Sequence, residues 1–338
     1  MSNQFNPIAR LEEVLGPVAR TFDYLGRQIE GGSLPDQWKE EGVWAAEVLA
    51  DALGQDWLDK FMATSGTPYL KFTLAPRLLP QLASTVEFAA HFQVLTGIPG
   101  LTDIRRQMRS QLEPGVMAHA SLQLEVAALE RRRSGTVALE VDRGPGNWKP
   151  DVMLSHAGTL IGVECLRLGI ADDVASHLAT PDAPAKVHDG WRRIGARIIV
   201  KAGQPAEAGG WLRCELDDGM FANQQWFTSA LSAMSLAEKA AILAQGARES
   251  MQTTGSIHGL VLSSPASSSI GTQNEDHRLP EGGISLRREL PGERSRETFI
   301  IPSEYAADSE SEMWAELYAQ EPTWLEWALS TIRTEGNR

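Results

Sequence analysis

The sequence predicts an α/β protein that begins with a helical domain, and two patterns of apolar residues lead to this fold class. Before about residue 110, apolar residues recur at three- and four-residue spacing, as in VWAAEVLADAL and LLPQLASTVEFAAHFQVL, a period typical of amphipathic helices. After Val116, helical segments alternate with short runs rich in β-branched and apolar residues. We therefore expect a helical N-terminal domain over residues 1–112 and an α/β core over residues 113–303.

The expected elements of the core follow the chain in order. The segment VMAHASLQLEVAALERRR is predicted to form a helix with Gly135 as its C-cap. Helices are also expected at about 188–202 and at SLAEKAAILAQGARESM, and the predicted strands are TVALEVD, PDVMLS, TLIGVECLRL, WLRCEL and IHGLVLSS. The Ser-, Gly- and Arg-rich stretch 264–296 is expected to be a long loop, and ETFIIP an edge strand. Residues 304–338 should form an acidic, Trp-containing helical segment.

Composition limits the class of protein. Of the 338 residues, 42% are hydrophobic and 22% charged, as in ordinary globular proteins, and no apolar run approaches the roughly 18 residues of a membrane span. The N-terminus lacks the pattern of a signal peptide, so we expect a cytoplasmic protein with no membrane partner. Two cysteines supply neither a disulfide framework nor a zinc spacing. The net charge of −13 argues against a general nucleic-acid coating protein, although basic residues gather between Lys186 and Lys201.

The segment 150–167 is predicted to be a β-hairpin that brings two carboxylates together. A two-residue turn at Ala157–Gly158 sets Asp151 directly opposite Glu164. Opposed side chains on one sheet face have Cβ atoms about 4.5–5.5 Å apart. Because neighbouring carboxylates repel each other, a divalent cation is the usual compensation, and Mg²⁺ or Mn²⁺ prefers such oxygen ligands. A turn that differs by one residue would instead leave the two acids on opposite faces.

The order of these parts resembles the PD-(D/E)XK nuclease superfamily over residues 117–265. The parts are a helix with Glu125, a strand, Pro150-Asp151, a hairpin, Glu164-Cys165-Leu166, a helix and a strand. The resemblance implies a restriction-endonuclease-like mixed central sheet flanked by helices. It also implies that Asp151 and Glu164 are metal ligands and that Glu125 is an accessory acid. A metal held in this way polarises a phosphate and lowers the pKa of the water that attacks it.

The chain departs from the superfamily's pattern at one position. The residue two after the second acid is normally a lysine that stabilises developing negative charge, and here it is Leu166. Lys149, two residues before Asp151, is one candidate replacement. The alternative is a basic side chain from the following helix, which would also hold the substrate. The candidates there are Arg193, Arg197 and Lys201.

Two functions follow from these residues. The first is a metal-dependent nuclease acting on DNA, with RNA as the less favoured substrate, in which basic helix faces hold the phosphate backbone. The second is a nuclease-fold protein without catalysis, which binds nucleic acid or a protein partner, the latter through the N-terminal helices; Leu166 is its main support. An α/β enzyme of other chemistry ranks third because the chain has no GxSxG elbow, P-loop or GxGxxG fingerprint.

Overall fold

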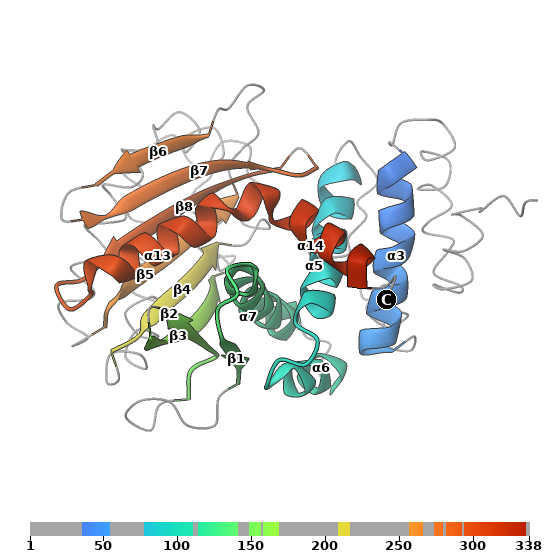
Figure 1. Ribbon diagram of the computed structural model, residues 1–338, viewed down its shortest axis with the longest axis horizontal. Helices are drawn as coiled ribbons and strands as arrows, with labels where there is room; N and C mark the ends of the chain where they lie inside the picture. The colour runs from blue at the N-terminus through green and yellow to red at the C-terminus, as the bar shows by residue number, and fades with distance from the viewer. Residues whose placement is uncertain are drawn as a thin grey trace, which may run out of the picture.

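The computed structural model describes the chain over most of its predicted core and part of the helical region. The described residues are 36–54, 78–110, 114–140, 149–156, 158–168, 209–216, 257–265, 274–279, 282–292 and 294–335. They form a twisted β-sheet with helices packed on one face and a further group of helices beside it (Figure 1). The predicted α/β class with N-terminal helices is confirmed for these residues.

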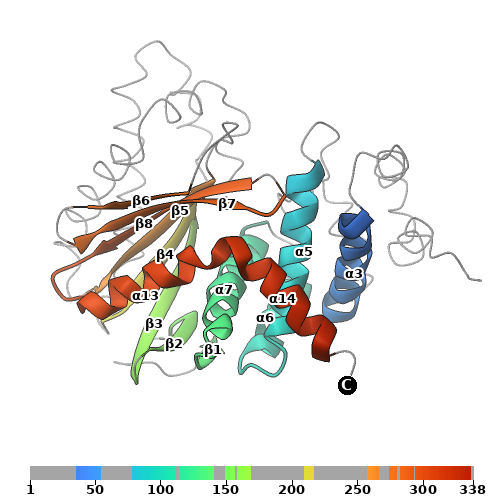
Figure 2. The same ribbon diagram turned by 45° about the horizontal axis from the view of Figure 1, so that its top comes forward.

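The helices described before the first strand are α3 (Asp36–Leu53), α5 (Leu78–Val94), α6 (Leu101–Ser110) and α7 (Pro114–Arg132). Helix α7 packs on the first three strands, and α5 and α6 pack on α7. Helix α3 packs on α5 at the far end of the molecule from the sheet (Figures 1 and 2). Apolar residues of these helices and of the sheet belong to one buried cluster, so the helical region and the sheet share a core.

The sheet contains eight described strands and is mixed. The strands are β1 (Val137–Leu139), β2 (Val152–His156), β3 (Thr159–Leu168), β4 (Trp211–Leu216), β5 (Gly259–Pro265), β6 (Glu275–Arg278), β7 (Ile284–Leu290) and β8 (Arg294–Pro302). Their order in the sheet is β1-β2-β3-β4-β5-β8-β7-β6. Strands β3, β4 and β5 are parallel, and the remaining neighbours are antiparallel.

The predicted hairpin register is confirmed. His156 pairs with Thr159 and Val152 pairs with Val163, as a two-residue turn requires, and Gly158 has a φ of +82°. One face of the hairpin is buried against α7, with Val152, Leu154, Ile161 and Val163 at most 2% exposed. This burial fixes the register, because a slip of one strand by one residue would turn its two apolar side chains away from the core.

Residues 264–296 differ from the predicted long loop. They contain the end of β5, all of β6 and β7 and the start of β8. The expected edge strand ETFIIP lies inside β8, which is between β5 and β7 rather than at the edge of the sheet. The prediction failed because Ser and Arg are typical of loops, whereas here Arg288 is buried, Arg296 is only 14% exposed, and both pair with acidic residues.

The acidic C-terminal segment is helical, as predicted, but it packs as part of the core. Helices α13 (Asp308–Ala319) and α14 (Glu321–Glu335) lie against β7 and β8, and α14 continues to α5 and α3 (Figure 2). Trp314 and Trp324 are at most 1% exposed, and the Trp324 indole donates to the carbonyl of Ala128 in α7 at 3.0 Å. No helix among the described residues is both long and apolar enough to cross a membrane.

The end of α7 has a Schellman turn in which Ser134, not the predicted Gly135, is left-handed. Ser134 has a φ of 60°, and the amides of Ser134 and Gly135 donate to the carbonyls of Arg131 and Glu130 at 3.0 and 3.3 Å. A Cβ on Gly135 would lie 2.0 Å from Oε1 of Glu130. Gly135 thus leaves room for the Glu130 side chain, and the strained backbone falls on a serine.

We expect Ser134→Gly to raise the free energy of unfolding by about 0.5–1 kcal/mol, because glycine removes the left-handed strain. The gain is smaller than the strain itself, since glycine loses more conformational entropy on folding than serine does. Urea unfolding would measure the change. Ser110→Gly is the control, since Ser110 ends α6 without a positive φ and its hydroxyl caps the Gln107 carbonyl at 3.0 Å. A stability of Ser134→Gly equal to or below that of the wild type would contradict the assignment of strain.

Candidate metal centre

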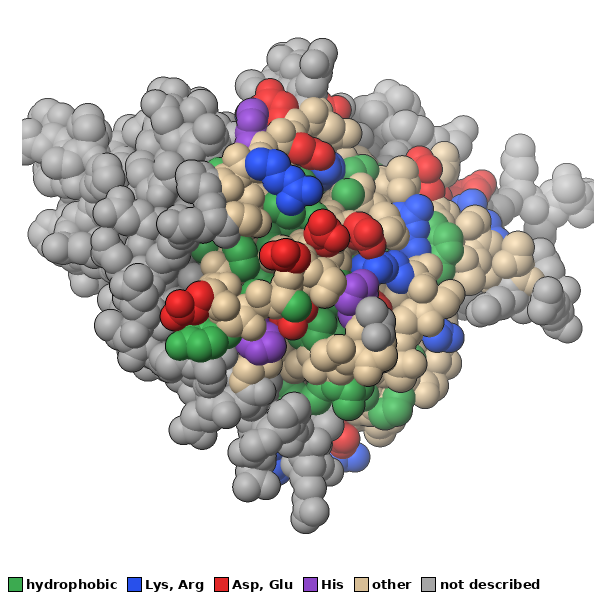
Figure 3. All heavy atoms as spheres, turned by 60° about the vertical axis from the view of Figure 1, so that its left-hand side comes forward, with side chains coloured by type: hydrophobic (Ala, Val, Ile, Leu, Met, Phe, Trp, Pro, Cys, Tyr) green, Lys and Arg blue, Asp and Glu red, His purple; other side chains and the backbone are tan. Residues whose placement is uncertain are grey.

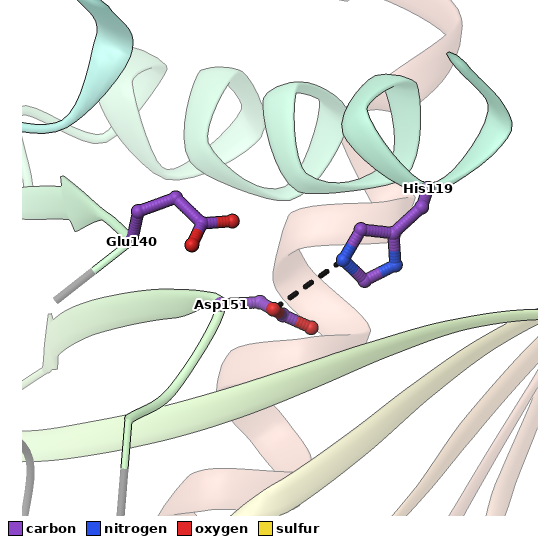
Figure 4. A group of neighbouring side chains, drawn as sticks. All are labelled: His119, Glu140 and Asp151. Atoms are coloured by element: carbon purple, nitrogen blue, oxygen red, sulfur yellow. Dashed lines mark ion pairs between the residues drawn. The ribbon is translucent and has the colours of Figure 1, made fainter. Parts of the chain in front are cut away.

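Three side chains from separate elements meet at the end of the sheet that α7 covers. His119 comes from the first turns of α7, Glu140 directly follows β1, and Asp151 directly precedes β2 (Figure 4). One potential ligand atom from each lies within 4.8 Å of the others. The side chains of His119 and Asp151 are 28% and 13% exposed, and Glu140 is exposed, so solvent reaches the group.

The backbone explains why Glu140 and Asp151 come together. Glu140 follows β1 with a φ of 46°, and its amide donates to the carbonyl of Asp151 at 3.0 Å. The Asp151 carboxylate is fixed in turn, because its Oδ2 accepts from the Cys165 amide of β3 at 2.7 Å. The backbone hydrogen bond between Glu140 and Asp151 thus brings the two residues together, and β3 holds the Asp151 carboxylate.

Helix α7 supplies a second polar residue one turn after His119. Gln123 is fully buried, and its Nε2 donates to Oε1 of Glu140 at 2.7 Å and lies 3.1 Å from Nε2 of His119. An amide nitrogen only donates, and the imidazole tautomer with its proton on Nδ1 lets Nε2 accept from it. In that tautomer, His119 presents a lone pair toward the carboxylates.

The donor set suits a divalent cation. Two carboxylates and an unprotonated imidazole nitrogen are common ligands of first-row transition metals. A tetrahedral ion with bonds of about 2.1 Å holds neighbouring ligand atoms about 3.4 Å apart. The distance between Nε2 of His119 and Oδ1 of Asp151 is 3.4 Å, which is long for a hydrogen bond and matches two ligands of one ion.

Asp151 is the predicted site residue that this group contains. The hairpin register, continued by one residue, sets Asp151 across from Glu164. Val163 and Cys165, on either side of Glu164, belong to the core cluster with α7. Because side chains alternate along a strand, Glu164, which is 4% exposed, points to the sheet face away from α7, whereas Asp151 lies beside His119 of α7. Coordination of one ion by Asp151 and Glu164 together stays a prediction.

Glu125 lies in a different environment from the one expected of an accessory metal ligand. Its Oε1 is 2.9 Å from Nη2 of Arg213, and its Oε2 is 3.0 Å from Nη1 of Arg296. Burial opposes ionisation, but Arg296 and Arg213 outweigh it and hold the pKa of Glu125 at about 2. Both carboxylate oxygens are thus occupied by guanidinium groups, and the geometry does not favour a role in metal binding.

The other predicted site residues fall into three cases. Lys149 is exposed, and Leu166, at the position of the superfamily's lysine, is half-buried opposite Cys214 of β4. Cys165, between Glu164 and Leu166, is a fully buried core residue, and burial together with Asp151 raises the pKa of its thiol. The proposed substrate-binding residues lie outside the described residues; they are Arg193, Arg197 and Lys201.

Sequence reasoning missed His119, Gln123 and Glu140. His119 stands in no paired-histidine motif, which is the pattern that normally identifies a metal-binding histidine in a sequence. A weak signal was present, because His119 and Gln123 have the four-residue spacing that places them on one face of a helix. Glu140 gave no signal, since it sits inside a run that reads as continuous strand.

No protein-family model, curated protein or solved structure gives a significant match to the chain. The fold and the site by themselves define the class: an α/β protein with a mixed, open sheet of eight described strands and a candidate divalent-metal centre where α7, β1 and β2 meet.

Proposed function

We propose that this chain is a metal-dependent, nuclease-like protein that acts on DNA. The observation that carries the proposal is the position of Asp151. The residue that the sequence motif marks as a metal ligand lies with His119 and Glu140 in a group whose donor atoms are within 4.8 Å of one another. A cation there would polarise a phosphate oxygen and lower the pKa of a bound water, the chemistry that phosphodiester hydrolysis needs.

The charge on the described surface limits where DNA would approach. The exposed side of α13 carries Asp308, Glu312 and Glu316, and acidic side chains gather near the middle of the described face in Figure 3. Phosphate groups would be repelled from this part of the molecule. The metal centre lies away from these acidic residues, at the N-terminal end of α7, where His119 and Asp151 are partly exposed.

A second function, binding without catalysis, has Leu166 as its support. Leu166 supplies no charge where the superfamily has a lysine, and Lys149, the near alternative, is exposed. A cation-binding protein of this kind would still bind phosphodiester groups, without a side chain to stabilise the developing charge of the transition state.

Cleavage of single- and double-stranded DNA and RNA in Mg²⁺ and in Mn²⁺ tests the two functions directly. We expect Asp151→Asn to abolish DNA cleavage and to weaken Mn²⁺ binding at least about tenfold, because the amide keeps an acceptor for Cys165 but loses the charge that attracts the ion. Calorimetric titration would give the affinity.

The matched control is Asp103→Asn, which makes the same change in an exposed side chain paired with Arg106 at 2.8 Å on α6. Cleavage that survives Asp151→Asn would contradict this site. Tight DNA binding with no cleavage in either metal would favour the binding function instead.

A further inference from the structure

Gln123 carries an unexplained polar atom beside the candidate metal centre. Its side chain is completely buried, and its amide nitrogen makes both contacts described above, to Glu140 and to His119. Its amide oxygen Oε1 has no hydrogen-bond partner among the described residues. A buried acceptor without a partner costs about 1–3 kcal/mol, so its presence next to a group of metal-ligand atoms calls for a reason.

The two ends of a glutamine amide are nearly equal in size, and a half-turn about the last side-chain bond exchanges them. Such a turn would move Oε1 to the place where Nε2 now stands, between His119 and Glu140. With the imidazole proton on Nδ1, the oxygen there would face a carboxylate and an imidazole lone pair, which is unfavourable unless a cation lies among them. With a cation present, the same position makes Oε1 a ligand.

We propose that Gln123 is a fourth ligand of the His119–Glu140–Asp151 centre, and that its amide turns over when a divalent transition-metal ion binds. This inference rests on the proposed metal site. Without the ion, the amide hydrogens of Gln123 bond to the lone pairs of His119 and Glu140. When the ion binds, the turn puts the amide oxygen in their place. The centre then offers one nitrogen and three oxygens.

The donor set also predicts which ions bind. An imidazole nitrogen suits Zn²⁺, whereas Mg²⁺, Ca²⁺ and Mn²⁺ prefer oxygen ligands and water. We therefore expect the full chain to bind Zn²⁺ at least about a hundredfold more tightly than Mg²⁺. His119→Asn should remove this preference. Equal affinities for Zn²⁺ and Mg²⁺ in the wild type would overturn the imidazole as a ligand.

Two substitutions at Gln123 separate a ligand from a residue that only orients its neighbours. Gln123→Met removes both ends of the amide and should weaken Mn²⁺ binding about tenfold or more. Gln123→Glu keeps an oxygen and adds a charge, so a ligand role predicts tighter Mn²⁺ binding, by about tenfold. If Gln123 only donates to Glu140, Gln123→Glu loses the donor, adds repulsion and weakens binding instead.

Calorimetric titration with Mn²⁺ and Zn²⁺ measures these affinities, and the rise in Tm on adding the ion gives a second readout. Gln93→Met is the control, because Gln93 is exposed on α5 and its replacement should leave the affinity unchanged. Circular dichroism would establish that each variant is folded. Weaker Mn²⁺ binding by Gln123→Glu, or unchanged binding by Gln123→Met, would overturn the inference.

The outcomes for the ion and for DNA are separable. Cleavage of DNA that depends on Asp151, together with unchanged Mn²⁺ affinity in the Gln123 variants, would leave the proposed function standing and remove Gln123 as a ligand. Ion binding that responds to Gln123 as expected, with neither cleavage nor binding of DNA, would support the centre and overturn the nuclease function.

Discussion

Replacing Arg213 by methionine is expected to lower the free energy of unfolding by about 3–5 kcal/mol, the usual cost of removing one partner from a buried ion pair. Arg213 lies on β4 and is completely buried. Its guanidinium contacts Oε1 of Glu125 at 2.9 Å, donates to the Tyr318 hydroxyl and donates to the carbonyl of Cys214. Methionine fills much of the same space and supplies none of these donors.

The size of the effect follows from what is left behind. Glu125 is also buried, and it would keep Arg296 as its remaining cation at 3.0 Å. The Tyr318 hydroxyl would lose the donor that faces it and keep only its own donation to Oε1 of Glu125 at 3.3 Å. Arg296 cannot neutralise Glu125 alone, because it also pairs with Glu215.

Urea unfolding monitored by circular dichroism measures the loss as a shift in midpoint at constant slope. Arg106→Met is the control: this arginine pairs with Asp103 on the exposed side of α6, and its removal should change stability by less than about 0.5 kcal/mol. A loss below about 1 kcal/mol for Arg213→Met would contradict a buried pair.

Glu125→Gln tests the same network from the acidic side and bears on the metal centre. Both of its oxygens contact arginines, so we expect the variant to be less stable but to change its Mn²⁺ affinity by less than about twofold. Loss of a metal ligand, or of a group that orients one, would instead lower the affinity about tenfold or more. An affinity lowered about tenfold, in a variant that remains folded, would restore Glu125 as an accessory ligand.

The hairpin was predictable from sequence because its determinants are local. A two-residue turn and the alternation of Val152, Leu154, Ile161 and Val163 leave one register that buries all four side chains. The same reasoning placed Asp151 at the start of the second strand. Its surroundings were only half predictable, because alternation cannot foresee that Oδ2 of Asp151 would accept from the Cys165 amide where the strands separate.

The features that sequence reasoning missed depend on contacts between distant segments. Strand β8 contains Arg294 and Arg296, which mark a loop by composition but pair with Glu87 and Glu125 from helices far away in the chain. Glu140 leaves the strand because its amide meets the carbonyl of Asp151, which lies beyond an intervening segment. A single sequence shows charged residues, but not which opposite charge each will meet.

Glu321→Gln is expected to remove a loss of stability that the wild type suffers between pH 4.5 and about pH 7. Glu321 begins α14 and is 3% exposed. Burial raises the pKa of its carboxyl to about 7; Arg296 opposes the shift, and Glu125 and Glu87 add to it. Arg296 thus stabilises the anionic form of Glu125, while Glu321 keeps its proton at lower pH.

The sign follows from which state binds more protons. Below pH 4.5, the ordinary value, Glu321 is protonated in the folded and unfolded chains alike. Between pH 4.5 and about 7, the unfolded chain ionises while the folded chain stays protonated, so the free energy of unfolding falls as pH rises. Each pKa unit corresponds to 1.36 kcal/mol, which gives a total on the order of 3 kcal/mol. Glutamine does not titrate, so this contribution disappears in the variant.

Urea unfolding of both proteins at pH 4.5, 6 and 8 measures the difference. Relative to the wild type, Glu321→Gln should gain about 3 kcal/mol between pH 4.5 and pH 8, with most of the gain reached by pH 7. Glu326→Gln, on the exposed side of the same helix, should run parallel to the wild type. Glu130, whose pKa burial also raises to about 7, contributes the same trend in both proteins and cancels in the comparison. If the stability difference between Glu321→Gln and the wild type is constant with pH, Glu321 ionises normally and Arg296 neutralises both carboxylates. If this difference shrinks as pH rises, the pKa of Glu321 is lowered rather than raised.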